Sequence, residues 1–266
     1  MYGAILGDII GSPYEFEPFN IKTKNFPLFT KYSRFTDDSV MTLAIAQAIL
    51  DTTDKYDLIT LKKNFIYSMQ SMGRKYPNAG YGGNFRIWLN KQNPEPYGSF
   101  GNGSAMRVSS VAWLYDDIIS VRNVAKLSAE VSHNHPEGIK GAEATASAIF
   151  LARKGFDKTA IRHYIEDNFA YSFSRTCDEI RPTYRFDVSC MGTVPEAMTA
   201  FFESVDFEDC IRTAVSLGGD CDTLTAIAGS IAEAYYGTPD SLKSECYRRL
   251  PDDLVSILLR FQNHVK

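Results

Sequence analysis

The feature that most restricts the fold of this sequence is that helical patterns fill most of the chain, whereas strand-like alternation is scarce. In residues 38–51, for example, Met41, Ile45 and Ala48 fall on one face of a helix. Several segments are also rich in alanine, the best helix former. Eight further segments have similar helical character: 104–115, 121–132, 137–154, 158–167, 193–204, 207–216, 221–236 and 251–263.

These patterns predict an all-α fold in which many helices pack together. The segments 137–154 and 221–236 have small or apolar residues on most faces, which predicts that they are central helices. The chain has 266 residues, with no internal repeat, low-complexity tract or interdomain linker. We therefore expect residues 1–266 to form a single compact domain.

The composition argues against several classes of protein. The formal net charge is −4, so no basic excess is present to neutralise a nucleic-acid backbone. No apolar run approaches the roughly 20 residues that span a bilayer, and the N-terminus lacks the basic region of a secretory signal. The number of cysteines is odd and no CxxC occurs, which argues against a disulfide framework or a zinc site. A cytoplasmic location is predicted.

Three long stretches, 11–36, 72–104 and 168–192, interrupt the helical pattern. They contain half of the glycines and most of the proline and aromatic residues, and their aromatic content disfavours disorder. Long loops in a compact domain are commonly functional. We expect these three stretches to line or cover a site.

Two acidic clusters stand directly before predicted helices. The first is Thr36-Asp37-Asp38, before the helix at 38–51, and the second is Asp220-Cys221-Asp222-Thr223, before the helix at 221–236. Such residues are preferred helix N-caps, and a capping role alone is one interpretation of each cluster. However, a cap needs one acceptor, and each cluster supplies two carboxylates and a hydroxyl.

If the two helix starts face each other, four carboxylates and two hydroxyls converge. Their mutual repulsion would require a cation. Because all the donors are oxygen atoms, they favour Mg²⁺, Mn²⁺ or Ca²⁺ over Zn²⁺ or Cu²⁺. Four carboxylates balance the charge of two divalent ions, which predicts a binuclear centre at the helix N-termini.

Two more acidic residues lie near the N-terminus. Asp8 falls within a short apolar segment that fits a buried helix, where its carboxylate needs a partner. Glu15 follows Pro13 in the first long loop, a position typical of a solvated surface charge.

These motifs, in this order, resemble those of the ADP-ribosylglycohydrolase family. The resemblance covers nearly the whole chain, and the pairing of the two acidic motifs at this separation is specific. The matching residues are Gly7-Asp8, Gly11, Glu15-Phe16, Phe35-Thr36-Asp37-Asp38-Ser39, Gly101-Asn102-Gly103-Ser104-Ala105-Met106-Arg107, His133, Pro136, Gly141-Ala142 and Gly218-Gly219-Asp220-x-Asp222-Thr223.

The resemblance implies a compact all-α hydrolase with two divalent cations, Mg²⁺ or Mn²⁺. Such an enzyme would cleave the bond at C1 of the distal ribose in an ADP-ribosylated protein or small molecule and release free ADP-ribose. Glu15 becomes a candidate catalytic residue through its match to the family's loop glutamate. The implied metal ligands are Thr36, Asp37, Asp38, Asp220, Asp222 and Thr223.

Elementary chemistry agrees with this function. Bound cations can hold the cis hydroxyls of a ribose and lower the pKa of a nearby water. The transition state would have oxocarbenium character. Either Glu15 or Asp37 is a candidate to take the proton of the water, and the sequence does not rank them.

The glycine-rich segment 98–107 precedes a predicted helix, so its backbone N–H groups are candidates to bind phosphate. A tight turn with Ser104 as the helix cap is the structural alternative. The resemblance favours binding of the diphosphate through Gly101, Asn102, Gly103 and Ser104. Arg107 is a candidate to pair either with phosphate or with an acidic residue.

Three other residues are candidate substrate contacts. The resemblance places His133 near the ligand, although Asn134 and His135 stand between it and Pro136. Tyr81 and Phe100 are candidates to offer aromatic faces to adenine.

Two other functions remain open from the sequence. The first is a non-catalytic protein of the same fold that binds ADP-ribose or a nucleotide. The second is a metal-dependent phosphohydrolase, although no His-Asp dipeptide of the kind common in helical phosphohydrolases occurs. The sequence does not identify the leaving group, so arginine, serine, an acetyl ester and a nucleobase all remain candidates. Nucleic acid is expected as a partner only if it is the modified substrate.

Overall fold

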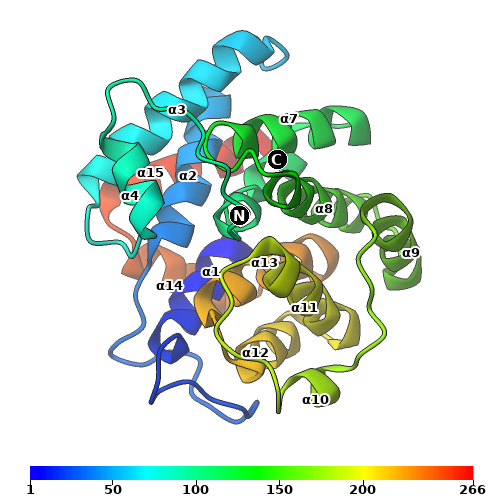
Figure 1. Cartoon of the computed structure of the whole chain (residues 1–266). Helices are drawn as coiled ribbons and strands as arrows, with labels where there is room; N and C mark the ends of the chain where they lie inside the picture. Colours follow the sequence, from blue (N-terminus) through cyan, green and yellow to red (C-terminus); the bar gives the residue numbers. More distant parts are fainter. Residues whose placement is uncertain (266) are drawn as a thin grey trace.

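The computed structural model describes residues 1–265 and is all-α, as predicted (Figure 1). Within these residues no β-strand forms, and the only strand-like pairing is an isolated antiparallel bridge between Gly101 and Ser189. The helices are α1 (Tyr2–Gly11), a 3₁₀ turn (Ser12–Tyr14), α2 (Asp37–Leu50), α3 (Leu58–Lys75), α4 (Gly83–Asn90), α5 (Gly103–Met106), α6 (Ser109–Leu114), α7 (Ile118–Glu130), α8 (Pro136–Arg153), α9 (Lys158–Phe169), α10 (Cys177–Ile180), α11 (Cys190–Glu203), α12 (Phe207–Leu217), α13 (Cys221–Tyr236), α14 (Asp240–Arg249) and α15 (Asp252–Val265).

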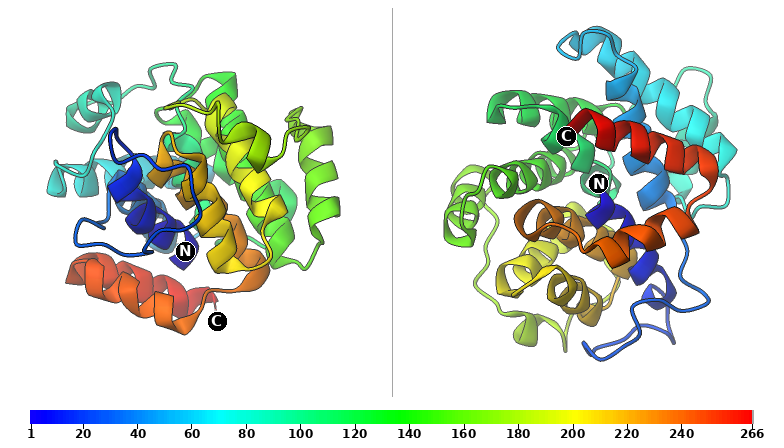
Figure 2. Two further views of the ribbon diagram at one scale, coloured as in Figure 1. Left: turned by 90° about the horizontal axis from the view of Figure 1, so that it is seen from below. Right: turned by 180° about the vertical axis from the view of Figure 1, so that it is seen from behind.

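Helix α13 is the central element of the fold. Its residues 221–233 are all buried, and it packs against α1, α8, α11 and α12. Helix α8 is also buried along most of its length, which confirms the prediction of central helices at 137–154 and 221–236. The C-terminal helix α15 lies across α2 on the far side of the molecule (Figure 2, right). One connected hydrophobic core joins these elements.

A stripe of glycines lets α1 and α13 approach each other unusually closely. Gly3, Gly7 and Gly11 recur every four residues and so share one face of α1. A Cβ atom on Gly7 would lie 2.3 Å from the carbonyl oxygen of Thr225, and one on Gly11 would lie 2.6 Å from the Cα of Asp222. This close crossing brings the acidic residue of α1, Asp8, beside the N-terminus of α13.

Replacement of Gly7 by alanine is therefore expected to lower the free energy of unfolding by about 2–3 kcal/mol, because the added methyl group meets backbone atoms that cannot rotate away. Chemical denaturation of the wild type and the variant measures this difference. Gly83→Ala is the matched control, since a Cβ atom there meets nothing within 4 Å. Equal losses in the two variants would contradict the close-crossing explanation.

The start of α1 is bound by a carboxylate near the C-terminus of α13. Glu233, near the C-terminus of α13, accepts hydrogen bonds from the backbone N–H groups of Tyr2 (3.0 Å) and Gly3 (2.8 Å). These are N–H groups that a helix leaves unpaired at its start. The glycine contacts set the distance between α1 and α13, and these hydrogen bonds fix the position of α1 along the axis of α13.

The structure differs from the helix predictions in two ways. The predicted helix at 104–115 is two short helices, α5 and α6, and the chain turns at Arg107, whose buried guanidinium donates to the carbonyl of Ser128 and the hydroxyl of Ser132. Helices α3, α4, α10 and α14 were not predicted. Helix α3 is amphipathic, with Leu61 and Phe65 among its buried residues, so its signal was present in the sequence. Most of α14 is exposed and polar.

Two global expectations concern the membrane and the cysteines. Among residues 1–265, no helix combines the length and the apolarity needed to cross a bilayer. All five cysteines are buried free thiols: Cys177, Cys190, Cys210, Cys221 and Cys246.

Candidate active site

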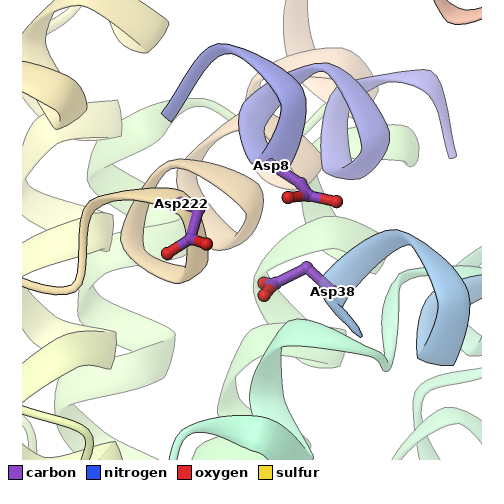
Figure 3. Close-up of side chains that lie close together, drawn as sticks. All are labelled: Asp8, Asp38 and Asp222. Carbon is purple, nitrogen blue, oxygen red and sulfur yellow. The ribbon is translucent and has the colours of Figure 1, made fainter. Parts of the chain in front are cut away.

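The two acidic helix starts meet in the folded chain. Thr36 caps α2, and the hydroxyl of Thr223, in the first turn of α13, donates to the carboxylate of Asp38 across a distance of 3.2 Å. The carboxylates of Asp38 and Asp222 point toward the same space from α2 and α13 (Figure 3). The condition on which the metal-site hypothesis depends is therefore met: both segments face one site.

Asp8, on α1, is a third contributor to this space. Its carboxylate accepts hydrogen bonds from the backbone N–H groups of Thr36 (2.8 Å) and Ser39 (3.0 Å), and also from both hydroxyls of these residues. Asp8 thus has the partners that a buried carboxylate needs, and it links α1 to the start of α2 (Figure 3). The sequence marked Asp8 as needing a partner, but it did not place Asp8 among the ligands.

The carboxylates form two groups of three that share Asp222. In the first, Asp8, Asp38 and Asp222 each offer an oxygen within 4.8 Å of the others. In the second, the same holds for Glu15, Asp220 and Asp222. Glu15 is therefore no isolated surface charge, although it follows a loop-like turn.

The donor chemistry of these two groups fits divalent cations. Every candidate ligand is an oxygen atom, the type that Mg²⁺, Mn²⁺ and Ca²⁺ prefer. One of them, Oδ1 of Asp38, is buried without a hydrogen-bond partner among the described residues. A buried unpaired carboxylate oxygen is costly unless something charged binds it.

Burial and mutual repulsion raise the pKa values of these carboxyl groups. The pKa of Asp8 is about 6, mainly through burial, although four hydrogen bonds favour its ionised form. Burial, followed by the charge of Asp220, raises the pKa of Glu15 to about 7. Burial, followed by the charge of Asp8, raises the pKa of Asp37 to about 8. Bound cations would reverse these shifts.

These raised pKa values predict that the pH dependence of stability has opposite signs in the cation-free and the cation-bound protein. A carboxyl group whose pKa is higher in the folded than in the unfolded state holds its proton more tightly when folded, so stability falls as pH rises. For Glu15 and Asp37, the fall extends from about pH 4, the unfolded pKa, up to about 7 and about 8. The chelated protein is expected to melt at least about 3 °C lower at pH 8.5 than at pH 5.5.

With saturating Mn²⁺ or Mg²⁺, the melting temperature is instead expected to rise over the same pH range, because the cation binds the ionised carboxylates. Thermal unfolding with and without chelator at both pH values measures this. Identical pH profiles in the two conditions would contradict a cation site here.

A cavity of about 460 Å³ opens beside the acidic cluster. All three long stretches that interrupt the helical pattern contribute to its wall, as expected: Phe16 from the first, Tyr97 from the second and Phe186 from the third. Asp37, Asp38, Asp220, Asp222 and Thr223 line it together with Glu15. The cavity thus lies directly against the candidate cation site.

The glycine-rich segment also lines the cavity, and part of it has another role. The side-chain amide of Asn102 donates to the carboxylate of Asp220 (2.6 Å), so it orients the acidic cluster. The backbone N–H of Asn102 bonds to the carbonyl of Val188, and that of Gly101 bonds to the hydroxyl of Ser99. Two of the four N–H groups predicted to cradle a diphosphate are therefore already engaged.

Arg107 and His133 bring polar groups to the same wall. Both line the cavity and both are buried. Arg107 donates to a carbonyl and a hydroxyl, and no carboxylate pairs with it among residues 1–265, so of its two predicted partners the acidic residue is not found. Burial, followed by the charge of Arg107, keeps the pKa of His133 well below its usual range, so the imidazole is neutral. His135 instead caps α8.

Several predicted site residues do not line the cavity. Tyr81 is buried against the ring of Phe85, and Phe100 lies outside, edge-on to His135. Ser104 does not cap its helix; its hydroxyl donates to the carbonyls of Gly101 and Gly138. The structure therefore gives no support to Tyr81 and Phe100 as adenine contacts.

The aromatic residues that line the cavity are different ones. Phe16, Phe85, Tyr97 and Phe186 all line the cavity. All four stand in the three aromatic-rich stretches that the sequence singled out, although nothing in the local sequence distinguishes Phe85 or Phe186 from packing residues.

Comparison with known proteins gives the family. The family model described as ADP-ribosylglycohydrolase matches residues 1–264. The chain belongs to the ADP-ribosylglycohydrolase family. The resemblance inferred from the acidic and glycine-rich motifs is thereby confirmed.

Relatives and a solved structure extend the comparison. The mouse "ADP-ribosylhydrolase ARH3" is 26% identical, covering 92% of this chain and 85% of its own length. The "ADP-ribosylarginine hydrolase Tri1" of Pseudomonas putida (strain GB-1) is 25% identical, covering 89% of this chain and 69% of its own. A solved "ADP-ribosylglycohydrolase-related protein complex" matches with a TM-score of 0.71 and 22% identity over 99% of this chain and 95% of that one. This likeness shows the shared fold.

Proposed function

We propose that this protein is an ADP-ribosyl hydrolase that cleaves the bond at C1 of the distal ribose and releases ADP-ribose. The proposal rests on one observation: two clusters of three carboxylates, which share Asp222, lie beside a cavity of about 460 Å³. A volume of this size is typical of small-molecule sites. The printed names of the ADP-ribosylhydrolase relatives support the same activity.

The cofactor in this proposal is a pair of divalent cations, Mg²⁺ or Mn²⁺. Asp8, Asp38 and Asp222 would hold one, and Glu15 and Asp220, together with Asp222, would hold the other. Thr36, Asp37 and Thr223 remain candidate ligands from the sequence. When bound, such cations orient sugar hydroxyls and make a nearby water more acidic.

Glu15 and Asp37 are the candidates for proton transfer. Both line the cavity and are only half-buried, so a substrate or a water can reach them. Parallel kinetics of Glu15→Gln and Asp37→Asn, each with a measurement of Mn²⁺ affinity, would separate proton transfer from cation binding.

The part of the cavity wall formed by Arg107 and His133 is suited to the diphosphate. The buried guanidinium of Arg107 has no carboxylate partner among residues 1–265, and its Nε makes no hydrogen bond there. A buried cation in this state favours an anion nearby. The neutral imidazole of His133 lies against the loop at Gly101 and Gly103, where it offers one hydrogen bond and no charge.

The test is a panel of ADP-ribose substrates linked through arginine, serine, an acetyl ester and a nucleobase, each with Mg²⁺, with Mn²⁺ and with chelator. We expect release of ADP-ribose from at least one linkage, dependent on the cation. Activity that survives both chelation and the double substitution Asp37→Asn/Asp222→Asn would defeat the proposal. Tight ADP-ribose binding without turnover would point to the non-catalytic alternative, and phosphate release to a phosphohydrolase.

A further inference from the structure

A second cavity, of about 540 Å³, adjoins the first. Glu15, Phe16 and Phe186 line both cavities. The two aromatic rings stack on each other, with centroids 5.8 Å apart and an angle of 28° between their planes. These three side chains therefore form the partition between the cavities, and the candidate proton-transfer residue belongs to that partition.

Both cavities reach the acidic cluster. Asp220 lines the first, and its neighbour Gly219 lines the second. An enzyme that cleaves ADP-ribose from an acceptor must hold the two halves of its substrate on opposite sides of the scissile bond. Arg107 and the glycine-rich loop, the proposed diphosphate contacts, line the first cavity. The second cavity is therefore the space available to the acceptor.

The wall of the second cavity is built on fixed basic groups. The ammonium of Lys22 donates to the carbonyls of Tyr184 and Leu217, which leaves one of its three donors free. The Nη1 of Arg185 donates to the carbonyls of Pro182 and Tyr184. Within residues 1–265, neither Lys22 nor Arg185 forms an ion pair, and the other nitrogens of Arg185 make no hydrogen bond.

The charges of Lys22 and Arg185 act on each other, and the charge of Glu17 on the same wall opposes this effect. Burial, and after it the charge of Arg185, lowers the pKa of Lys22. Besides Glu15, which faces the acidic cluster, Glu17 is the only carboxylate that the described part of the chain contributes to this wall. The side of the cavity away from the cluster thus carries one net positive charge.

We propose that the second cavity is the acceptor-side subsite, and that Lys22 and Arg185 make it select peptides in which an acidic residue flanks the ADP-ribosylated one. This inference rests on the proposed hydrolase function. The cations hold their positions through backbone carbonyls, and the stacked rings of Phe16 and Phe186 give the acceptor an apolar surface beside them.

The experiment uses three peptides with the same ADP-ribose linkage and with Glu, Gln or Lys beside the modified residue. For the wild type, we expect kcat/KM to be about fivefold higher for the Glu peptide than for the Lys peptide, mainly through KM, because an exposed charge pair is worth up to about that factor. The ratio should approach one at about 0.5 M salt. Arg185→Glu should invert it.

Lys62→Glu is the control, because it makes the same change in charge on exposed α3, far from α10 and α12 in both the front and rear views (Figures 1 and 2). This variant should keep the wild-type ratio. A ratio unchanged in Arg185→Glu, or a wild-type preference for the Lys peptide, overturns the inference.

A fourth substrate separates the two proposals. ADP-ribose carrying only a methyl group at C1 of the distal ribose has no acceptor for the second cavity to bind. If the wild type cleaves this compound but has the same kcat/KM for all three peptides, the hydrolase function is supported and the acceptor-side subsite is refuted. If neither it nor any peptide is cleaved with Mg²⁺ or Mn²⁺, both proposals fail.

Discussion

Replacement of Asp222 by asparagine is expected to reduce kcat/KM for ADP-ribose release by about a thousandfold or more. Asp222 belongs to both carboxylate groups, so the substitution removes one anionic ligand from each. No other single residue of the cluster has this position. Steady-state kinetics at saturating Mn²⁺, and again at ten times that concentration, would show whether extra cation restores activity.

The same variant has a second, independent readout. Burial and the charges of Asp220 and Asp38 raise the pKa of Asp222 well above its usual range, so its charge destabilises the cation-free protein. Chelated Asp222→Asn is therefore expected to be at least as stable as the chelated wild type. The rise in melting temperature that Mn²⁺ gives the wild type should be lost.

Asp167→Asn, on exposed α9, is the matched control, since it removes one carboxylate at the surface. It should keep both the activity and the Mn²⁺-induced stabilisation. The metal-site proposal would be refuted by an Asp222→Asn enzyme with wild-type activity and a wild-type response to Mn²⁺.

Replacement of Asp8 by alanine is expected to give the largest loss of stability, about 3–5 kcal/mol. The Asp8 carboxylate accepts two backbone N–H groups and two hydroxyls from Thr36 and Ser39 at the buried start of α2. Alanine would leave these donors without partners, at a cost of about 1–3 kcal/mol for each that water cannot reach. Relief of repulsion within the acidic cluster offsets part of this cost when no cation is bound.

Urea denaturation with saturating Mg²⁺ measures the full effect, and denaturation after chelation measures the reduced one. Asp8→Asn is the conservative comparison, because its carbonyl oxygen can still accept part of the bonds. We expect it to fall between the wild type and Asp8→Ala. A loss below about 1 kcal/mol for Asp8→Ala would show that the start of α2 does not depend on this carboxylate.

Much of the fold was predictable because helical periodicity is a local property. The patterns at 38–51, 137–154 and 221–236 gave α2, α8 and α13 to within a residue or two. Prediction failed where local pattern and tertiary context disagree. The segment 104–115 reads as one helix, yet the buried bonds of Arg107 hold a turn in its middle. Polar α14 has too little apolar periodicity to be seen.

The close crossing of α1 and α13 could have been predicted from a glycine pattern that the sequence analysis did not use. Gly3, Gly7 and Gly11 stand every four residues, and small residues on one helix face permit close approach. Read in this way, the spacing would have placed Asp8 against the start of α13. Without that step, Asp8 was only a buried carboxylate in need of a partner.

The sequence by itself determined the helical class, the two acidic helix starts and the kind of cation that their oxygens favour, because these follow from residue types and short spacings. Only the tertiary structure decided that Asp8 joins Asp38 and Asp222, that Asn102 holds Asp220, and that Phe16, Phe85, Tyr97 and Phe186, not Tyr81 and Phe100, line the cavity. The physical reason is that the direction of a side chain in a long loop is set by the helices it packs against, which lie far away in the sequence.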